Sequence, residues 1–163
     1  MNTMPWNYWI DADNPKPLTI EAINKLEEVL ARNPSHPMAI HLYIHAVESS
    51  SQPERAEAAA DILLDLVPGA GHLVHMPSHI YWRVGRYADA SKSNEMAAAV
   101  DEAYIAACNA QGFYPAAYYP HNIHFLWPQE VNIMWIVSCR IKALRITSSD
   151  ICLINCSCHL IGF

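Results

Sequence analysis

The feature that most restricts the fold of this chain is an internal repeat with a period of 34 residues. Moving the sequence by one period places alanines, a proline and two histidines on residues of the same or a similar kind. The matched positions are Ala22, Ala56 and Ala90; Val29, Leu63 and Ala97; Pro34 and Pro68; His41 and His75; and His45 and His79. A period of this length is typical of stacked helical pairs, because one pair cannot bury its apolar face alone.

The repeat predicts two antiparallel helices in each unit. Small residues such as Ala56 let two helices approach closely, and Pro34 and Pro68 end helices because proline lacks the backbone N–H. Thr19 is the expected N-cap of the first helix. Pro77 is expected either to kink its helix or to mark its start. The expected helices span residues 19–33, 37–50, 54–66, 72–84 and 87–108, and an inserted loop at 111–120 precedes a helix that begins near Pro120.

Several strings resemble known helical-repeat sequences. The string "VGRYADA", followed by Ala97, is similar to the second helix of the tetratricopeptide repeat. The strings "HLYIHAVE", "LVPGAGHLVHMPSHIYWRVGRYADA" and "YYPHNIHFLW" resemble a bacterial group of tetratricopeptide-like proteins over about residues 4–127. This resemblance implies an all-α, right-handed helical solenoid. It also implies that the chain is a fragment of a longer protein, and it implies a fold rather than an activity.

The pattern divides the chain into three parts. Residues 1–18 are an irregular lead, residues 19–130 hold the tetratricopeptide-like repeats, and residues 131–163 form an atypical tail. The tail does not continue the repeat, so it is either an end unrelated to the family or a divergent last helical pair. Its string "CLINCSCH" offers three thiols and a histidine, but without the C-x₂-C spacing usual for zinc sites.

Charge and hydropathy exclude two classes of partner. The net charge is −6, and lysine and arginine form no stripe, which argues against nucleic-acid binding. No run of 18 apolar residues occurs, so we expect no membrane span. The first residues lack the basic and apolar regions of a secretory signal, and a cytoplasmic location is the default expectation.

Histidines recur in the repeat at helical spacing. Residues three and four apart on a helix lie within about 60° of each other, so each first helix presents a histidine stripe. The resemblance implies that these first helices line the concave face of the solenoid. The candidate metal ligands are His41, His45, Glu48, His75, His79, His121 and His124. Imidazole and carboxylate ligands suit zinc, iron, copper or manganese.

Two other interpretations of the histidines stay open. They can be structural, each hydrogen-bonded within a polar and aromatic core. The concave groove can instead bind a peptide or protein segment, or a small molecule, without metal. The groove residues expected for this role are His72, Tyr81, Trp82 and Arg83. We therefore expect a helical-repeat binding module with a transition-metal site, and a metal-free interaction scaffold is the alternative.

Catalysis does not follow from these residues. Leu42 and Met76 follow the first histidine of their respective pairs. The H-E-x-x-H motif of zinc proteases is therefore absent. A catalytic role of the metal in the full-length protein is an added expectation, with no substrate, reaction or catalytic residue assigned.

Overall fold

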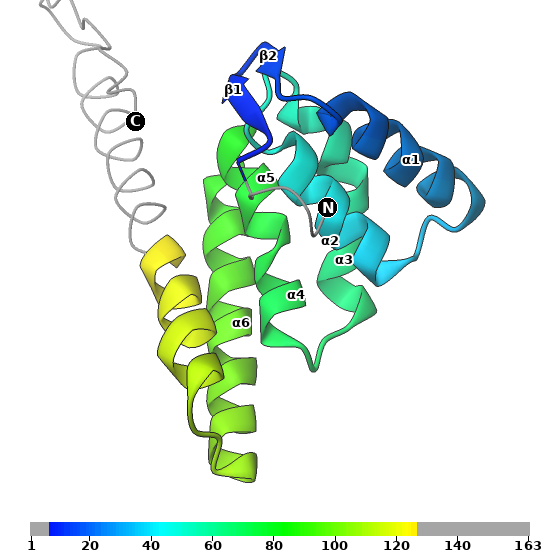
Figure 1. The fold of residues 1–163 in the computed structure, drawn as a ribbon. Coiled ribbons are helices and arrows are strands. Elements are labelled where there is room, and N and C mark those ends of the chain that lie inside the picture. The colour runs from blue at the N-terminus through cyan, green and yellow to red at the C-terminus, as the bar shows by residue number, and fades with distance from the viewer. Residues whose placement is uncertain (1–6, 127–163) are drawn as a thin grey trace, which may run out of the picture.

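In the computed structural model, the described part of the chain is residues 7–126 (Figure 1). The predictions made for the tail at residues 131–163, including its cysteines, lie outside this part. The helices are α1 (Thr19–Arg32), α2 (Pro37–Val47), a 3₁₀ turn (Pro53–Ala56), α3 (Glu57–Leu66), α4 (Gly71–His75), α5 (Pro77–Arg83) and α6 (Tyr87–Cys108). The prediction of an all-α fold is confirmed at this level.

A short hairpin precedes the helices, within the lead that the sequence indicated as irregular. Strand β1 (Trp9–Asp11) pairs antiparallel with β2 (Asn14–Pro15). The indole of Trp9 donates a hydrogen bond to the carbonyl of Ala46 at 2.7 Å, which fixes the hairpin to α2. The hydroxyl of Thr19 donates to the carbonyl of Tyr8 at 2.7 Å. The prediction of Thr19 as an N-cap is therefore wrong, because its side chain holds the lead and Leu18 takes the cap position.

Helices that are neighbours in sequence pack on each other. Helix α2 contacts α1 and α3, while α4 and α5 both contact α3 and α6. A further contact joins α2 to α5, so the two histidine-bearing segments lie next to each other (Figure 1). Among residues 7–126, no helix has both the length and the apolar character that a bilayer crossing requires.

The alanines of the repeat lie where helices meet. Ala56, Ala90 and Ala97 are fully buried, as is Leu63. The corresponding position in the first repeat, Val29, is 39% exposed, because α1 is the first helix and no earlier helix of the described chain covers it. The repeat therefore predicted burial correctly at the later positions and less well on α1, the first helix.

The segment around Pro77 consists of two short helices with a nearly continuous path. Helix α4 ends at His75 and α5 begins at Pro77, since proline cannot donate the hydrogen bond that would join them. Met76 between them keeps right-handed helical angles, with φ −52° and ψ −39°. The helical spacing of His75 and His79 is thus preserved across the break.

The prediction of a loop at residues 111–120 is wrong. After Gly112, which has φ 87°, the backbone turns into a π-helical segment (Tyr114–Tyr118) and then an α-helical one at residues 119–126. This segment runs alongside α6 (Figure 1). The buried carboxylate of Asp101 on α6 accepts hydrogen bonds from Tyr114 at 2.6 Å and Asn122 at 2.7 Å. Pro115, which the sequence pattern had indicated as a loop residue, lies at the start of the π-helical segment, where a backbone N–H would have no intrahelical partner.

Candidate metal centre

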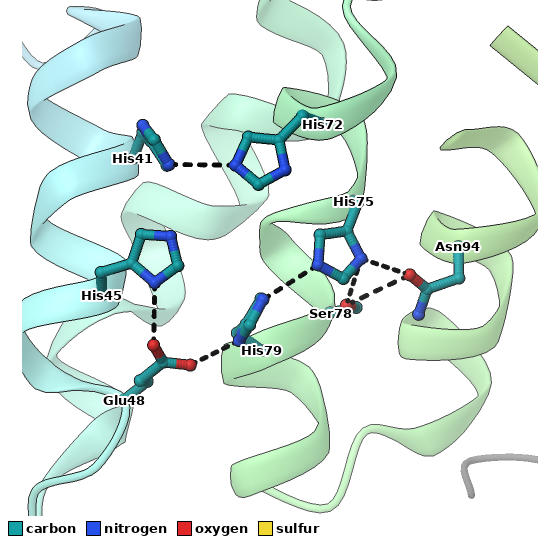
Figure 2. Close-up of polar contacts among 8 residues, drawn as sticks. All are labelled: His41, His45, Glu48, His72, His75, Ser78, His79 and Asn94. Carbon is teal, nitrogen blue, oxygen red and sulfur yellow. Dashed lines mark hydrogen bonds and ion pairs between the residues drawn. The ribbon is translucent and has the colours of Figure 1, made fainter. Parts of the chain in front are cut away.

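Six imidazoles from three parts of the chain converge on one region, which we call the histidine cluster. Helix α2 carries two of them, the α4–α5 segment carries three, and the segment at residues 119–126 carries one. The members are His41, His45, His72, His75, His79 and His121. Figure 2 shows the five rings from α2, α4 and α5 facing one another across the gap between these helices. Because the rings come from separate helices, the packing of these helices on one another creates the cluster.

The cluster consists of two triads. The first is His41, His45 and His72, and the second is His75, His79 and His121. Within each triad, the ligand atoms lie within 4.8 Å of one another. The first triad is half-buried, whereas His75 and His79 are 0% and 7% exposed. Each triad can hold a metal ion through three nitrogen ligands.

Glu48, at the C-terminal end of α2, connects the two triads. Its carboxylate accepts a hydrogen bond from Nδ1 of His45 at 2.8 Å and another from Nδ1 of His79 (Figure 2). Burial raises the pKa of Glu48, but the hydrogen bonds from these two imidazoles outweigh it and hold the pKa at about 2. Because their Nδ1 atoms donate to Glu48, the nitrogen that each of these imidazoles can offer to a cation is Nε2.

Asn94 on α6 orients His75 in the same way. The amide nitrogen of Asn94 donates to the carbonyl of Ala90 at 3.0 Å, so its amide oxygen faces the imidazole. This oxygen lies 2.5 Å from Nδ1 of His75, and the hydroxyl of Ser78 lies 3.4 Å from the same nitrogen. Nδ1 of His75 therefore carries the proton, and its Nε2 has a lone pair.

Two of these lone pairs face each other. Nε2 of His75 lies 2.9 Å from Nε2 of His79, while both Nδ1 atoms already donate to oxygen (Figure 2). Two neutral imidazoles in these tautomers would repel each other at this distance. The geometry therefore calls for a positive charge at the pair, either a proton or a metal ion.

Burial keeps several of these imidazoles neutral. Burial, with a smaller contribution from neighbouring imidazoles, lowers the pKa of His41 to about 4 and that of His72 to about 3. The same causes lower the pKa of His121 and place that of His75 well below its usual value. Neutral imidazole is the form that ligates metals, so these groups are available as ligands at neutral pH.

The first triad is held less tightly than the second. Nε2 of His72 lies 3.3 Å from Nε2 of His41, and Nδ1 of His41 lies 3.4 Å from the sulfur of Met38. Within the described residues, the buried Nδ1 of His72 has no hydrogen-bond partner. The first triad therefore has fewer groups that fix its tautomers.

The remaining predicted ligands and groove residues take different positions. His124 is exposed and belongs to neither triad. Phe125, which follows His121 by four residues, fills the inward stripe of that segment, its ring centroid 4.6 Å from that of His79. Glu48, expected as a ligand, belongs to neither triad and instead accepts hydrogen bonds from Nδ1 of His45 and His79. His72, expected in the groove, instead completes the first triad.

A pocket of about 410 Å³ lies next to the second triad. Its walls include the groove residues Trp82 and Arg83, together with Glu48, His79 and Phe125. Arg83 donates to the carbonyl of Ser50 at 3.0 Å. Tyr81 was expected in this groove but lies in the core, where its hydroxyl donates to Asp61 at 2.8 Å.

The sequence pattern did not identify Asn94 or Phe125 as part of the site. Asn94 lies four residues after Ala90 on the buried side of α6. A buried polar group must find a hydrogen-bond partner. Its place between Ala90 and Ala97 is the pattern that could have revealed it.

Comparison with known proteins returned no relative. No protein-family model, no curated protein and no solved structure matches the chain. The function proposed below is therefore argued from the geometry of the histidine cluster.

Proposed function

We propose that this chain is a helical-repeat module that binds transition-metal ions in the histidine cluster. The observation that carries the proposal is the 2.9 Å approach of the Nε2 atoms of His75 and His79, whose Nδ1 atoms donate to Asn94 and Glu48. A metal ion removes the repulsion between these lone pairs. This arrangement of supporting hydrogen-bond acceptors behind ligating imidazoles is typical of metal sites.

A shared proton explains less of the geometry than a metal does. A proton between His75 and His79 satisfies two nitrogen atoms, whereas six imidazoles converge on this region. Gathering half-buried and buried polar rings costs stability when they are not fully satisfied. A bound metal offsets that cost because it engages three rings of a triad at once.

The ligand types favour particular metals. Both triads offer only imidazole nitrogen, and the carboxylate of Glu48 is occupied by two imidazole donors. Imidazole suits zinc, copper, iron and nickel, whereas manganese prefers oxygen ligands. Zinc, copper, iron and nickel are thus the favoured ions. Three protein ligands leave a coordination position open, which is the arrangement that catalytic metal sites use.

The overall arrangement in this proposal is a tetratricopeptide-like, right-handed solenoid. Support comes from the 34-residue period and from the packing of α2 on α3 and of α4 and α5 on α6. In this arrangement, the triads lie on the first helices of successive units, facing the concave side. The α2–α5 contact brings these first helices together.

Metal analysis of matched variants tests the proposal. The full chain, purified without an affinity tag, is stripped with a chelator, dialysed against Zn²⁺ and analysed for bound metal. His121→Ala removes a triad ligand, whereas His124→Ala changes an exposed residue of the same segment. We expect His121→Ala to bind less zinc than the unmodified chain and His124→Ala to bind the same amount. Equal zinc content in both variants and the unmodified chain would contradict the proposal.

A second candidate function is metal-free binding of a peptide or small molecule. The pocket beside Trp82 and Arg83 favours it, because Trp82 is 41% exposed and a guanidinium can grip a carboxylate. Under this alternative, chelator treatment leaves ligand binding unchanged and Arg83→Ala abolishes it. Under the metal proposal, His121→Ala has the larger effect on what the chain binds.

A further inference from the structure

The two triads are not separated in space. The ring centroid of His45 lies 5.4 Å from that of His79 in the second triad, but 6.5 Å from that of His72 in its own. A second contact joins the triads at His72 and His75, with centroids 5.9 Å apart. Both distances between the triads fall within the range of the distances inside them, which run from 4.8 to 6.5 Å, so the six rings form one continuous set.

Glu48 ties the two triads together chemically. One of its oxygens accepts from His45 of the first triad, and the other accepts from His79 of the second. A metal ion bound to Nε2 of either imidazole makes the Nδ1–H of the same ring a stronger hydrogen-bond donor. The Nδ1–H groups of His45 and His79 both donate to the carboxylate of Glu48. A metal ion bound in one triad should therefore change the metal affinity of the other.

The charges call for an additional anion. Two divalent ions bring four positive charges, and the six imidazoles bring none. Among residues 7–126, Glu48 is the carboxylate hydrogen-bonded to imidazoles of the cluster. A small anion shared by both ions would neutralise part of the excess, as hydroxide does in two-metal sites whose ions lie about 3.5–4 Å apart.

We infer that the two triads form one dinuclear metal centre, in which both ions share a small bridging anion of the hydroxide or azide class. This inference rests on the proposed function and adds the number of ions, their coupling and the class of the exogenous ligand. The pocket that reaches His79 and Glu48 provides a route by which such an anion enters.

Cobalt substitution tests the coupling. Co²⁺ is a spectroscopic stand-in for zinc, and its loading of the metal-stripped full chain is followed by metal analysis and electron paramagnetic resonance. We expect two Co²⁺ ions per chain, with the signal per cobalt falling when the second ion binds. Azide should shift the visible cobalt bands with one azide for each pair of ions.

Matched variants separate the outcomes. His41→Ala removes a ligand from the first triad, and His121→Ala removes one from the second. Each should bind one Co²⁺ fewer than the unmodified chain, recover the full signal per cobalt and lose the shared azide. His124→Ala should behave as the unmodified chain. Circular dichroism verifies that each variant is folded.

The failures of the two proposals are distinguishable. If the unmodified chain binds a single Co²⁺ that His121→Ala abolishes, the dinuclear inference is overturned and the metal-site proposal survives. Two ions whose signals stay independent and fully intense also overturn the inference. If neither triad variant changes the bound cobalt, both proposals fail.

Discussion

His75 and His79 approach each other through their Nε2 atoms at 2.9 Å, while Asn94 and Glu48 accept their Nδ1 protons. The pair is pre-oriented by groups from two other helices, α6 and α2. Such supporting acceptors fix the tautomer and the direction of an imidazole lone pair, which raises its value as a ligand.

Glu48→Gln should weaken metal binding about 10- to 100-fold, the usual cost of losing an outer carboxylate. The amide keeps one acceptor oxygen, so one of the two imidazoles loses its partner. The affinity is measured by competition with a chelator of known strength. Glu28→Gln is the control, because this side chain is 52% exposed and lies on α1. Unchanged affinity in Glu48→Gln would argue against a supporting role.

Asn94→Ala should lower both stability and metal affinity. The substitution removes the acceptor of the His75 proton and leaves a buried donor unsatisfied, which costs about 1–3 kcal/mol. Denaturant unfolding with and without Zn²⁺ separates the two effects. The stabilisation by Zn²⁺ should be smaller in Asn94→Ala than in the unmodified chain. If Zn²⁺ raises the free energy of unfolding by the same amount in both chains, Asn94 has a structural role and does not support metal binding.

Gly71→Ala should disrupt the position of α4. A Cβ at Gly71 would lie 1.9 Å from a carboxylate oxygen of Asp101 and 3.0 Å from the carbonyl of Ala97. Overpacking of this kind costs about 1–3 kcal/mol, and it would displace His72 and His75 from the cluster. Gly69→Ala is the matched control, since nothing lies within 4 Å of its added Cβ. The midpoint temperature of thermal unfolding should fall in Gly71→Ala and stay unchanged in Gly69→Ala.

The metal-stripped chain should lose stability as the pH falls from about 7 towards 4. The pKa of His41 drops from 6.5 to about 4 on folding, and that of His72 from 6.5 to about 3. Between those values the unfolded chain binds more protons, so acid favours unfolding. Each group contributes a slope of up to about 1.4 kcal/mol per pH unit, which solvent screening reduces.

Urea unfolding at a series of pH values measures this slope. Replacing His72 by Asn should flatten the dependence between pH 6.5 and 4, because one titrating group is removed. Stability that rises as the pH falls through this window would contradict the assignment of neutral, buried imidazoles.

The sequence predicted the parts of this structure that depend on local periodicity. The spacing of His41 with His45, and of His75 with His79, placed each pair on one helical stripe. The alanines at positions 56 and 90 marked the contacts between helices. These features follow from helix geometry alone.

Features that depend on packing between distant elements were not predictable. The orientation of His121 inward and His124 outward depends on a π turn and on where the segment docks on α6. The role of Asn94 depends on which side of α6 faces His75. Tyr81 lies on the same helix as His79 but turns into the core towards Asp61. A one-dimensional pattern contains no information about these contacts.

Anomalous X-ray scattering from a crystal of the zinc-loaded full chain would locate the metal ions relative to the six imidazoles. We expect an anomalous peak about 2.0–2.1 Å from Nε2 of His75 and His79, the usual zinc–imidazole distance. A second peak is predicted at the triad of His41, His45 and His72. Density showing these rings without any associated peak, or zinc bound only at residues outside both triads, would contradict the proposed metal centre.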